Sequence, residues 1–245
     1  PSVLSYSIEA NVLPSLLVLQ KRLELSEVEL KKVMLRQPSV LGYSIESNVL
    51  PSLAALQERL GLSEAELRKL VLGQPRVLSC SIESNILPSL AALQKRLDLS
   101  EEELRKIVVR MPSFFTYSIE NNVLPSLAAV QERLGLTEAE LKVIVVAMPT
   151  VQGYNVKGSL LPKLDWLEKE MCLTTRELRR RVVRFPAALT YSLDNRYRTR
   201  LKACRAANVP AITVLDRIRM RDDQFYPSIG EEIITGAFQR QVLKS

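Results

Sequence analysis

The chain has 245 residues, with 34 Lys and Arg against 27 Asp and Glu, and it contains no histidine. The lack of histidine excludes imidazole metal ligands, histidine-based triads and the commonest general base at neutral pH. Cys80, Cys172 and Cys204 lie too far apart to suggest a disulfide framework or a zinc-ligand spacing. A hydrophobic content of 47% with only 8 glycines favours a helical protein with a sizeable core.

Prolines recur every 37 residues and divide the chain into repeats. One column holds Pro1, Pro38, Pro75, Pro112, Pro149 and Pro186. A second column holds Pro14, Pro51, Pro88, Pro125 and Pro162, and ends at Thr199. We predict a single continuous solenoid domain of five repeats, at 1–37, 38–74, 75–111, 112–148 and 149–185, followed by a divergent terminal repeat and C-terminal cap at 186–245.

Each repeat predicts two helices in the same order. Candidate N-caps of the first helix are Ser7, Ser44, Ser81 and Ser118, and the Leu-Pro pair that follows indicates a kink or restart. Gly61 and Gly135 stand where this helix ends, as left-handed C-caps do. A capping box starts the second helix five times: Ser26 to Glu29, Ser63 to Glu66, Ser100 to Glu103, Thr137 to Glu140 and Thr174 to Glu177. The next proline ends the second helix, and the Pro-Ser-Val-Leu segment predicts a 3₁₀ turn.

Two antiparallel helices cannot bury their apolar faces alone, so successive repeats are expected to stack. This predicts an all-α fold, a superhelical α-solenoid of 37-residue helical repeats. Leu16, Leu19, Leu23, Leu30 and their equivalents are the expected stacking core. One tyrosine per repeat is interpreted as structural: Tyr6, Tyr43, Tyr117, Tyr154 and Tyr191.

The repeat pattern P-x-V-L-x-Y-S-I-E-x-N-V-L-P-x-L-x-x-L-x-x-x-L-G-L-S-x-x-E-L resembles that of the mitochondrial transcription termination factor (mTERF) family. The terminal segments from Tyr191 to Arg196 and from Asp222 to Phe225 are similar to the way these proteins end. The resemblance covers essentially the whole chain. It implies an α-solenoid that binds DNA or RNA in mitochondria or chloroplasts, without a catalytic motif or cofactor. Thr199 in place of proline and a missing capping box after Pro210 depart from the pattern and indicate a specialised C-terminal cap.

The positive charge is concentrated late in the chain. Residues 1–148 contain 16 Lys and Arg against 17 Asp and Glu, whereas residues 149–221 contain 16 against 6. Residues 222–245 contain 2 against 4. The basic character is therefore local, as expected for an electrostatic footprint on nucleic acid.

The candidate phosphate ligands follow from this distribution, because planar guanidinium donors suit phosphate oxygens. Arg181 also stands in a column otherwise held by Val33, Leu70, Ile107 and Ile144, so either no neighbour covers it or an anion does. The main candidates are Lys157, Arg176, Arg179, Arg180, Arg181, Arg184, Arg196, Arg198, Arg200, Lys202, Arg205, Arg217, Arg219 and Arg221. Weaker candidates on the outward face of earlier second helices are Lys32, Arg36, Lys69, Lys106 and Arg110.

Several residues also have structural interpretations. Lys31 and Lys32 can pair with nearby glutamates on a solvated helix. Trp166 and Tyr197 either stack on an unpaired base or fill a gap in the core. A recurring column is expected to form local ion pairs beside Glu58 and Glu132, and it holds Arg22, Arg59, Arg96 and Arg133.

These features predict a non-enzymatic organellar protein that binds double-stranded DNA or structured RNA, with ribosomal RNA among the candidates. The expected roles are transcription termination or regulation, RNA processing, and ribosome assembly. The alternative is a protein-interaction scaffold, such as a component of an organellar ribosome or RNA-modifying complex, because the first four repeats are nearly neutral. No metal or small-molecule substrate is expected. No membrane contact is expected either, since no apolar run approaches about 20 residues. The first residue is Pro1 rather than Met, so either a targeting segment has been removed or the sequence is a fragment, and a targeting peptide is expected to be absent from this chain.

Overall fold

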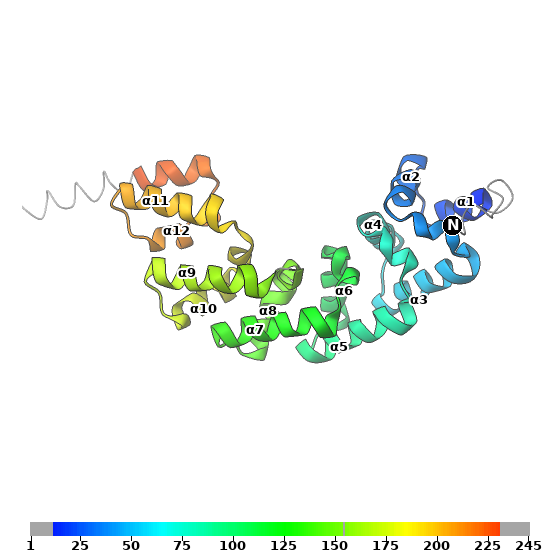
Figure 1. Cartoon of the computed structure of the whole chain (residues 1–245), viewed down its shortest axis with the longest axis horizontal. Coiled ribbons are helices and arrows are strands. Elements are labelled where there is room, and N and C mark those ends of the chain that lie inside the picture. The colour runs from blue at the N-terminus through cyan, green and yellow to red at the C-terminus, as the bar shows by residue number, and fades with distance from the viewer. Residues whose placement is uncertain (1–11, 154, 231–245) are drawn as a thin grey trace, which may run out of the picture. The chain divides into compact units, whose positions relative to one another are not determined.

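A computed structural model describes residues 12–153 and 155–230, which are helical with short connections and contain no strand (Figure 1). The chain divides into two compact units. Unit 1 comprises Pro1–Ala128 and Leu141–Gly153, and unit 2 comprises Ala129–Glu140 and Tyr154–Ser245. The all-α helical-repeat fold is confirmed, whereas the single continuous domain stays a prediction.

The first helix of each of the five repeats starts at the Leu-Pro pair, with proline in the first turn, where its missing N–H is not needed. In the terminal repeat this helix starts at Thr199. Gly61 and Gly135 follow two of these helices with φ of 59° and 61°, as the left-handed caps predicted. The first helices are α1 (Leu13–Arg22), α3 (Leu50–Leu60), α5 (Leu87–Leu97), α7 (Leu124–Leu134), α9 (Leu161–Met171) and α11 (Thr199–Ala206).

The second helices begin at the predicted capping boxes. In each of the five, the N-cap hydroxyl accepts the backbone N–H of the glutamate, and the glutamate accepts the backbone N–H of the N-cap. These helices are α2 (Glu27–Arg36), α4 (Glu64–Gly73), α6 (Glu101–Arg110), α8 (Glu138–Ala147) and α10 (Thr175–Arg184). The terminal repeat instead has the short α12 (Ile212–Asp216), and residues 222–230 are helical.

Two short segments join each second helix to the next first helix. The predicted 3₁₀ turns are η3 (Pro38–Gly42), η5 (Pro75–Ser79), η7 (Pro112–Thr116), η9 (Pro149–Gly153) and η11 (Pro186–Thr190). Each is followed by a π-type turn: η4 (Ile45–Val49), η6 (Ile82–Ile86), η8 (Ile119–Val123), η10 (Val156–Leu160) and η12 (Leu193–Arg198). Ser44 and Ser118 cap their turns as predicted, Ser81 does not, and Ser7 lies outside the described residues.

Within unit 1, successive repeats stack: α2 packs on α4, α4 packs on α6, and each π-type turn packs on the first helix of the preceding repeat. The core consists of the predicted leucine columns. Leu53, Leu90 and Leu164 are at most 1% exposed, and so are Leu67, Leu104 and Leu178. The repeat period therefore positions one equivalent surface per repeat, and differences between repeats lie in the side chains those surfaces carry.

Candidate nucleic-acid interface

A first ion-pair latch joins the ends of α1, α3 and α7 to the next repeat. Arg22 pairs with Glu64 and donates to Gln57 at 2.6 Å. Arg59 repeats this arrangement with Glu101 and Gln94, and Arg133 pairs with Glu168 and, at 2.8 Å, with Asp165. The arginine column is thus structural as predicted, but its partners belong to the following repeat rather than being the neighbouring Glu58 and Glu132.

A second latch uses the glutamate of the capping box. It joins Arg68 to Glu29 at 2.7 Å, Arg105 to Glu66 at 3.4 Å, Lys142 to Glu103 at 2.9 Å, and Arg179 to Glu140 at 2.5 Å. The backbone N–H of Ser26 and the Arg68 guanidinium lower the pKa of Glu29 to about 2. Because Arg179 holds Glu140 with two nitrogens, it lies in a repeat junction and is not a free phosphate ligand.

Arg181 in α10 is also taken by a protein partner. Its guanidinium pairs with Asp216 at the end of α12, and its side chain is 35% exposed. This carboxylate explains how a cation occupies a column that is apolar in earlier repeats. Neither an uncovered position nor a bound anion is needed to account for Arg181, although the sequence raised both alternatives.

The remaining arginines of α10 form an exposed row that we call the basic stripe: Arg176, Arg180 and Arg184. Residues four apart lie on one helical face, with a rise of about 6 Å per step. None of the three forms a hydrogen bond or an ion pair with another described residue. The basic stripe is therefore available to a ligand.

The end of α10 shows why Arg184 differs from its counterparts. Arg36 donates to the carbonyls of Leu72 and Gly73 at 2.9 and 3.1 Å, and Arg110 donates to Val146 at 3.4 Å. The carbonyl at the equivalent place after Arg184 belongs to Met220, and it accepts from Arg196 and Arg200 instead.

Arg219 adds a further exposed cation beside the C-terminal end of α10. Its guanidinium carbon lies 4.4 Å from the ring centroid of Phe185, the residue that follows Arg184. Tyr191 lies next to Phe185 and carries Arg196 on its ring at 4.5 Å. Stacking on the aromatic face limits the rotamers of Arg219. Sequence analysis did not identify this role of Phe185.

Arg200 is fully buried, which excludes it as a phosphate ligand in this conformation. It donates to the carbonyls of Arg217, Ile218 and Met220 and pairs with Asp222 at 2.8 Å. Arg196 is half-buried and donates to Ile218 and Met220. Both side chains thus satisfy backbone carbonyls after α12, which corrects their predicted role.

Lys163 is a related side chain that sequence analysis missed. Its ammonium donates to the carbonyls of Leu189 and Tyr191, each at 2.8 Å, and burial lowers its pKa. Lys163 and Arg200 occupy the column of Ser52 and Ser89. A cation replacing serine in the last two repeats was the available signal.

The other predicted ligands differ in how far they are already bound. Arg205 pairs with Glu170 at 2.5 Å, Arg198 with Asp194 at 3.1 Å, and Arg221 with Asp223 at 2.9 Å. Arg217 donates to the carbonyl and hydroxyl of Ser228. Lys157 and Lys202 are exposed and make no ion pair with a described residue.

Most of the weaker candidates in unit 1 already bind partners within the protein. Lys106 pairs with Glu102 at 2.7 Å one turn away, and Arg36 and Arg110 bind helix-end carbonyls as described above. Lys32 and Lys69 are exposed and form no ion pair within the described part of the chain. No continuous row comparable to the basic stripe results.

For Tyr197 the structure decides between base stacking and a place in the core. Tyr197 is fully buried, its hydroxyl donates to the carbonyl of Ala188 at 2.8 Å, and burial raises its pKa. Tyr197 is therefore a core residue. Trp166 packs near it at 6.3 Å between ring centroids and carries the Arg198 guanidinium at 5.7 Å.

Among residues 12–153 and 155–230, no helix is long and apolar enough to cross a bilayer. No group of three or more Cys, Asp or Glu side chains among them is arranged to hold a metal ion.

The stacked helical pairs, with one exposed basic face late in the chain, define a helical-repeat protein suited to an extended polyanion. The mTERF family model matches residues 21–226, and the chain belongs to this family. Members of this family are generally non-enzymatic, and membership indicates nucleic-acid-binding regulation of organellar gene expression. No curated protein matches the chain.

Proposed function

We propose that this protein regulates organellar gene expression by binding the phosphate backbone of double-stranded DNA or structured RNA through the basic stripe. One observation carries the proposal: Arg176, Arg180 and Arg184 are exposed and free of ion pairs, whereas most neighbouring arginines are bound within the protein. Lys157, Lys202 and Arg219 are further exposed cations in unit 2.

The basic stripe is unfavourable for the isolated helix. Like charges four residues apart destabilise a helix by about 0.2–0.5 kcal/mol per pair, and Arg176, Arg180 and Arg184 make two such pairs. In α6 the residue equivalent to Arg176 is Glu102, which pairs with Lys106. Bound phosphates would neutralise the same repulsion in α10 and would accept paired hydrogen bonds from each guanidinium.

Phosphate contacts give affinity and register but no direct sequence readout. The proposed interface therefore acts in transcription termination or regulation, RNA processing or ribosome assembly according to the polymer it prefers. The proposed compartment is a mitochondrion or a chloroplast. The experiment below separates DNA from RNA.

Binding to double-stranded DNA, structured RNA and single-stranded RNA of equal length should be measured by fluorescence anisotropy over a salt series. Replacing Arg176, Arg180 and Arg184 with Ala should weaken binding and flatten the plot of log K against log salt by about 2–3 units, because each lost phosphate contact removes about 0.9. Replacing Lys32, Lys69 and Lys106, the Arg180 equivalents in unit 1, is the matched control. Equal losses for both variants, or none for the first, would contradict the proposal.

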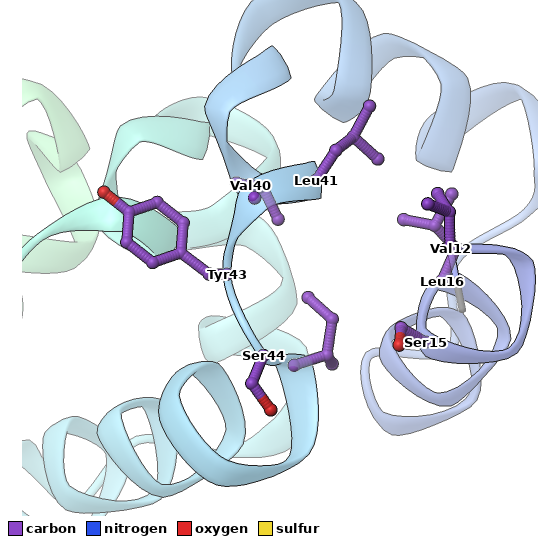
Figure 2. A pocket seen from close by; sticks show the side chains of 9 residues that line it. Val12, Ser15, Leu16, Val40, Leu41, Tyr43 and Ser44 are labelled. Atoms are coloured by element: carbon purple, nitrogen blue, oxygen red, sulfur yellow. The ribbon is translucent and has the colours of Figure 1, made fainter. Parts of the chain in front are cut away.

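A second candidate function, a protein-interaction scaffold, is supported by unit 1. Figure 2 shows a pocket lined by Val12, Leu16, Tyr43 and the turn η3. The same repeat exposes four apolar side chains: Leu13, Leu17, Val28 and Leu35, the last with 70% exposure. Leu13 and Leu17 share one face of α1, and Val28 and Leu35 share one face of α2. Exposed apolar faces of this kind are typical of protein contacts. If Leu17→Glu with Leu35→Glu leaves nucleic-acid binding intact but abolishes reporter regulation in organelles, this role is favoured.

A further inference from the structure

The junction between repeat 5 (149–185) and the terminal repeat uses both latches with their charges reversed. In earlier junctions the first helix supplies an arginine and the following repeat supplies the acceptor, as in Arg59 with Glu101 or Arg133 with Glu168. In α9, Glu170 stands at the arginine position, one repeat after Arg133. It accepts from Arg205 of α11 at 2.5 Å, across the same separation of 35 residues.

The second latch is reversed in the same way. Asp216 stands one repeat after Arg179, at the position that supplies the cation in four earlier pairs. An unchanged partner would place Asp216 against Glu177 of the capping box. Instead Arg181, in a formerly apolar column, pairs with Asp216. Both changes keep attraction across this junction while reversing its polarity.

This reversal matters because the inner repeats are nearly identical. The helix sequences LPSLAALQERL in α3, LPSLAALQKRL in α5 and LPSLAAVQERL in α7 differ at only one or two positions. Apolar stacking alone would therefore accept a repeat from the wrong place in the chain or from a second copy. Such exchange is a characteristic failure of repeat proteins.

We infer that the last junction is a charge-selective interface. Its ion pairs favour the terminal repeat over an inner repeat after repeat 5, and they favour repeat 5 over an inner repeat before the terminal repeat. An inner repeat placed after repeat 5 would bring a capping-turn carboxylate such as Glu64 toward Glu170. Its second-helix cation, equivalent to Arg68, would meet Glu177 as well as Arg181. The terminal repeat placed after an inner repeat would oppose Arg205 to arginine and Asp216 to glutamate. Every wrong combination therefore places like charges at the first latch, and the terminal repeat placed on an inner repeat does so at both latches.

The selectivity is moderate, because the latch side chains are partly exposed. Exposure is 62% for Arg205 and 22% for Glu170, and 35% for Arg181 and 49% for Asp216. Partly exposed pairs each change an equilibrium by up to about fivefold. The two together are expected to suppress wrong pairing by about tenfold. Nucleic-acid binding plays no part in this selectivity.

The test restores the inner polarity while keeping the junction paired. The full chain carrying Glu170→Arg, Arg205→Glu, Arg181→Ile and Asp216→Arg is unfolded in urea and refolded at high concentration as a mixture of isotopically heavy and light copies. Native mass spectrometry measures the fraction of mixed dimers, and cross-links between heavy and light copies identify which repeats are joined. A terminal repeat seated on repeat 5 of a second copy keeps its native pairs, so only dimers joined through other repeats are counted. This variant should form about ten times more of these mispaired dimers than the wild-type chain.

A matched control reverses an inner latch, with Arg22→Glu and Glu64→Arg. It should leave mixed dimers at the wild-type level, because repeat 5 and the terminal repeat keep the Glu170–Arg205 and Arg181–Asp216 pairs. Equal mixing in the wild-type and reversed chains overturns the inference, and so does an equal rise in the control. If the fourfold variant does not refold, Glu170→Arg with Arg205→Glu is measured alone; a several-fold rise supports the inference and no rise overturns it.

Discussion

At the scale of single residues, the role of each arginine depends on what already binds it. Arg180 faces solvent, whereas the adjacent Arg179 and Arg181 hold Glu140 and Asp216. The sequence predicted all three as phosphate ligands, because partners 35 to 39 residues away cannot be recognised from local charge spacing. Only the structure separates bound from available guanidinium groups.

Arg200 provides a stability prediction at this scale. Arg200→Met keeps much of the apolar stem over Phe225 but leaves the carbonyls of Arg217, Ile218 and Met220 without this donor. We expect a loss of about 2–3 kcal/mol in the free energy of unfolding, measured by urea titration. Lys202→Met, two residues away and exposed, should change stability by less than about 0.5 kcal/mol. Equal effects of the two substitutions would refute the structural role of Arg200.

At the scale of helices, the capping boxes couple local and long-range structure. Each one starts a second helix, and four of their glutamates also receive a cation from the following repeat. The sequence predicted all five boxes correctly, since Ser or Thr followed by Glu three residues later is a local signal. It did not predict the second contact, because that contact depends on how repeats stack.

These glutamates predict acid sensitivity. Hydrogen bonds from Ser26 and Arg68 lower the pKa of Glu29 to about 2 from 4.5, and the pKa values of Glu66, Glu103 and Glu140 are also lowered. The folded chain therefore binds fewer protons than the unfolded chain between about pH 4.5 and 2, so its stability falls as the pH decreases through this window.

Urea unfolding at pH 7, 4 and 3 measures this effect. Glu66→Gln keeps an acceptor for the capping box but removes the charge that faces Arg105, so the stability of this variant should depend less on pH. Glu58→Gln, on the exposed side of α3, should retain the wild-type dependence. Identical pH profiles for the two variants would show that the junction carboxylates do not carry the effect.

At the scale of the whole chain, the net charge differs between the early and late repeats although their fold is the same. Residues 1–148 are close to neutral, and residues 149–221 carry 16 Lys and Arg against 6 Asp and Glu. This division and the helical-repeat fold follow from the sequence alone. The structure reduces the basic region to fewer available cations, because Arg179, Arg181, Arg196, Arg200 and Arg205 are bound within unit 2.

The most direct test compares one available with one bound arginine. The salt dependence of binding to the preferred nucleic acid should be measured for Arg180→Ala and Arg205→Ala. We predict that Arg180→Ala lowers the slope of log K against log salt by about 0.9, the value for one phosphate contact, and that Arg205→Ala leaves the slope unchanged. An unchanged slope for Arg180→Ala, or an equal reduction for Arg205→Ala, would contradict the assignment of the basic stripe as the nucleic-acid contact.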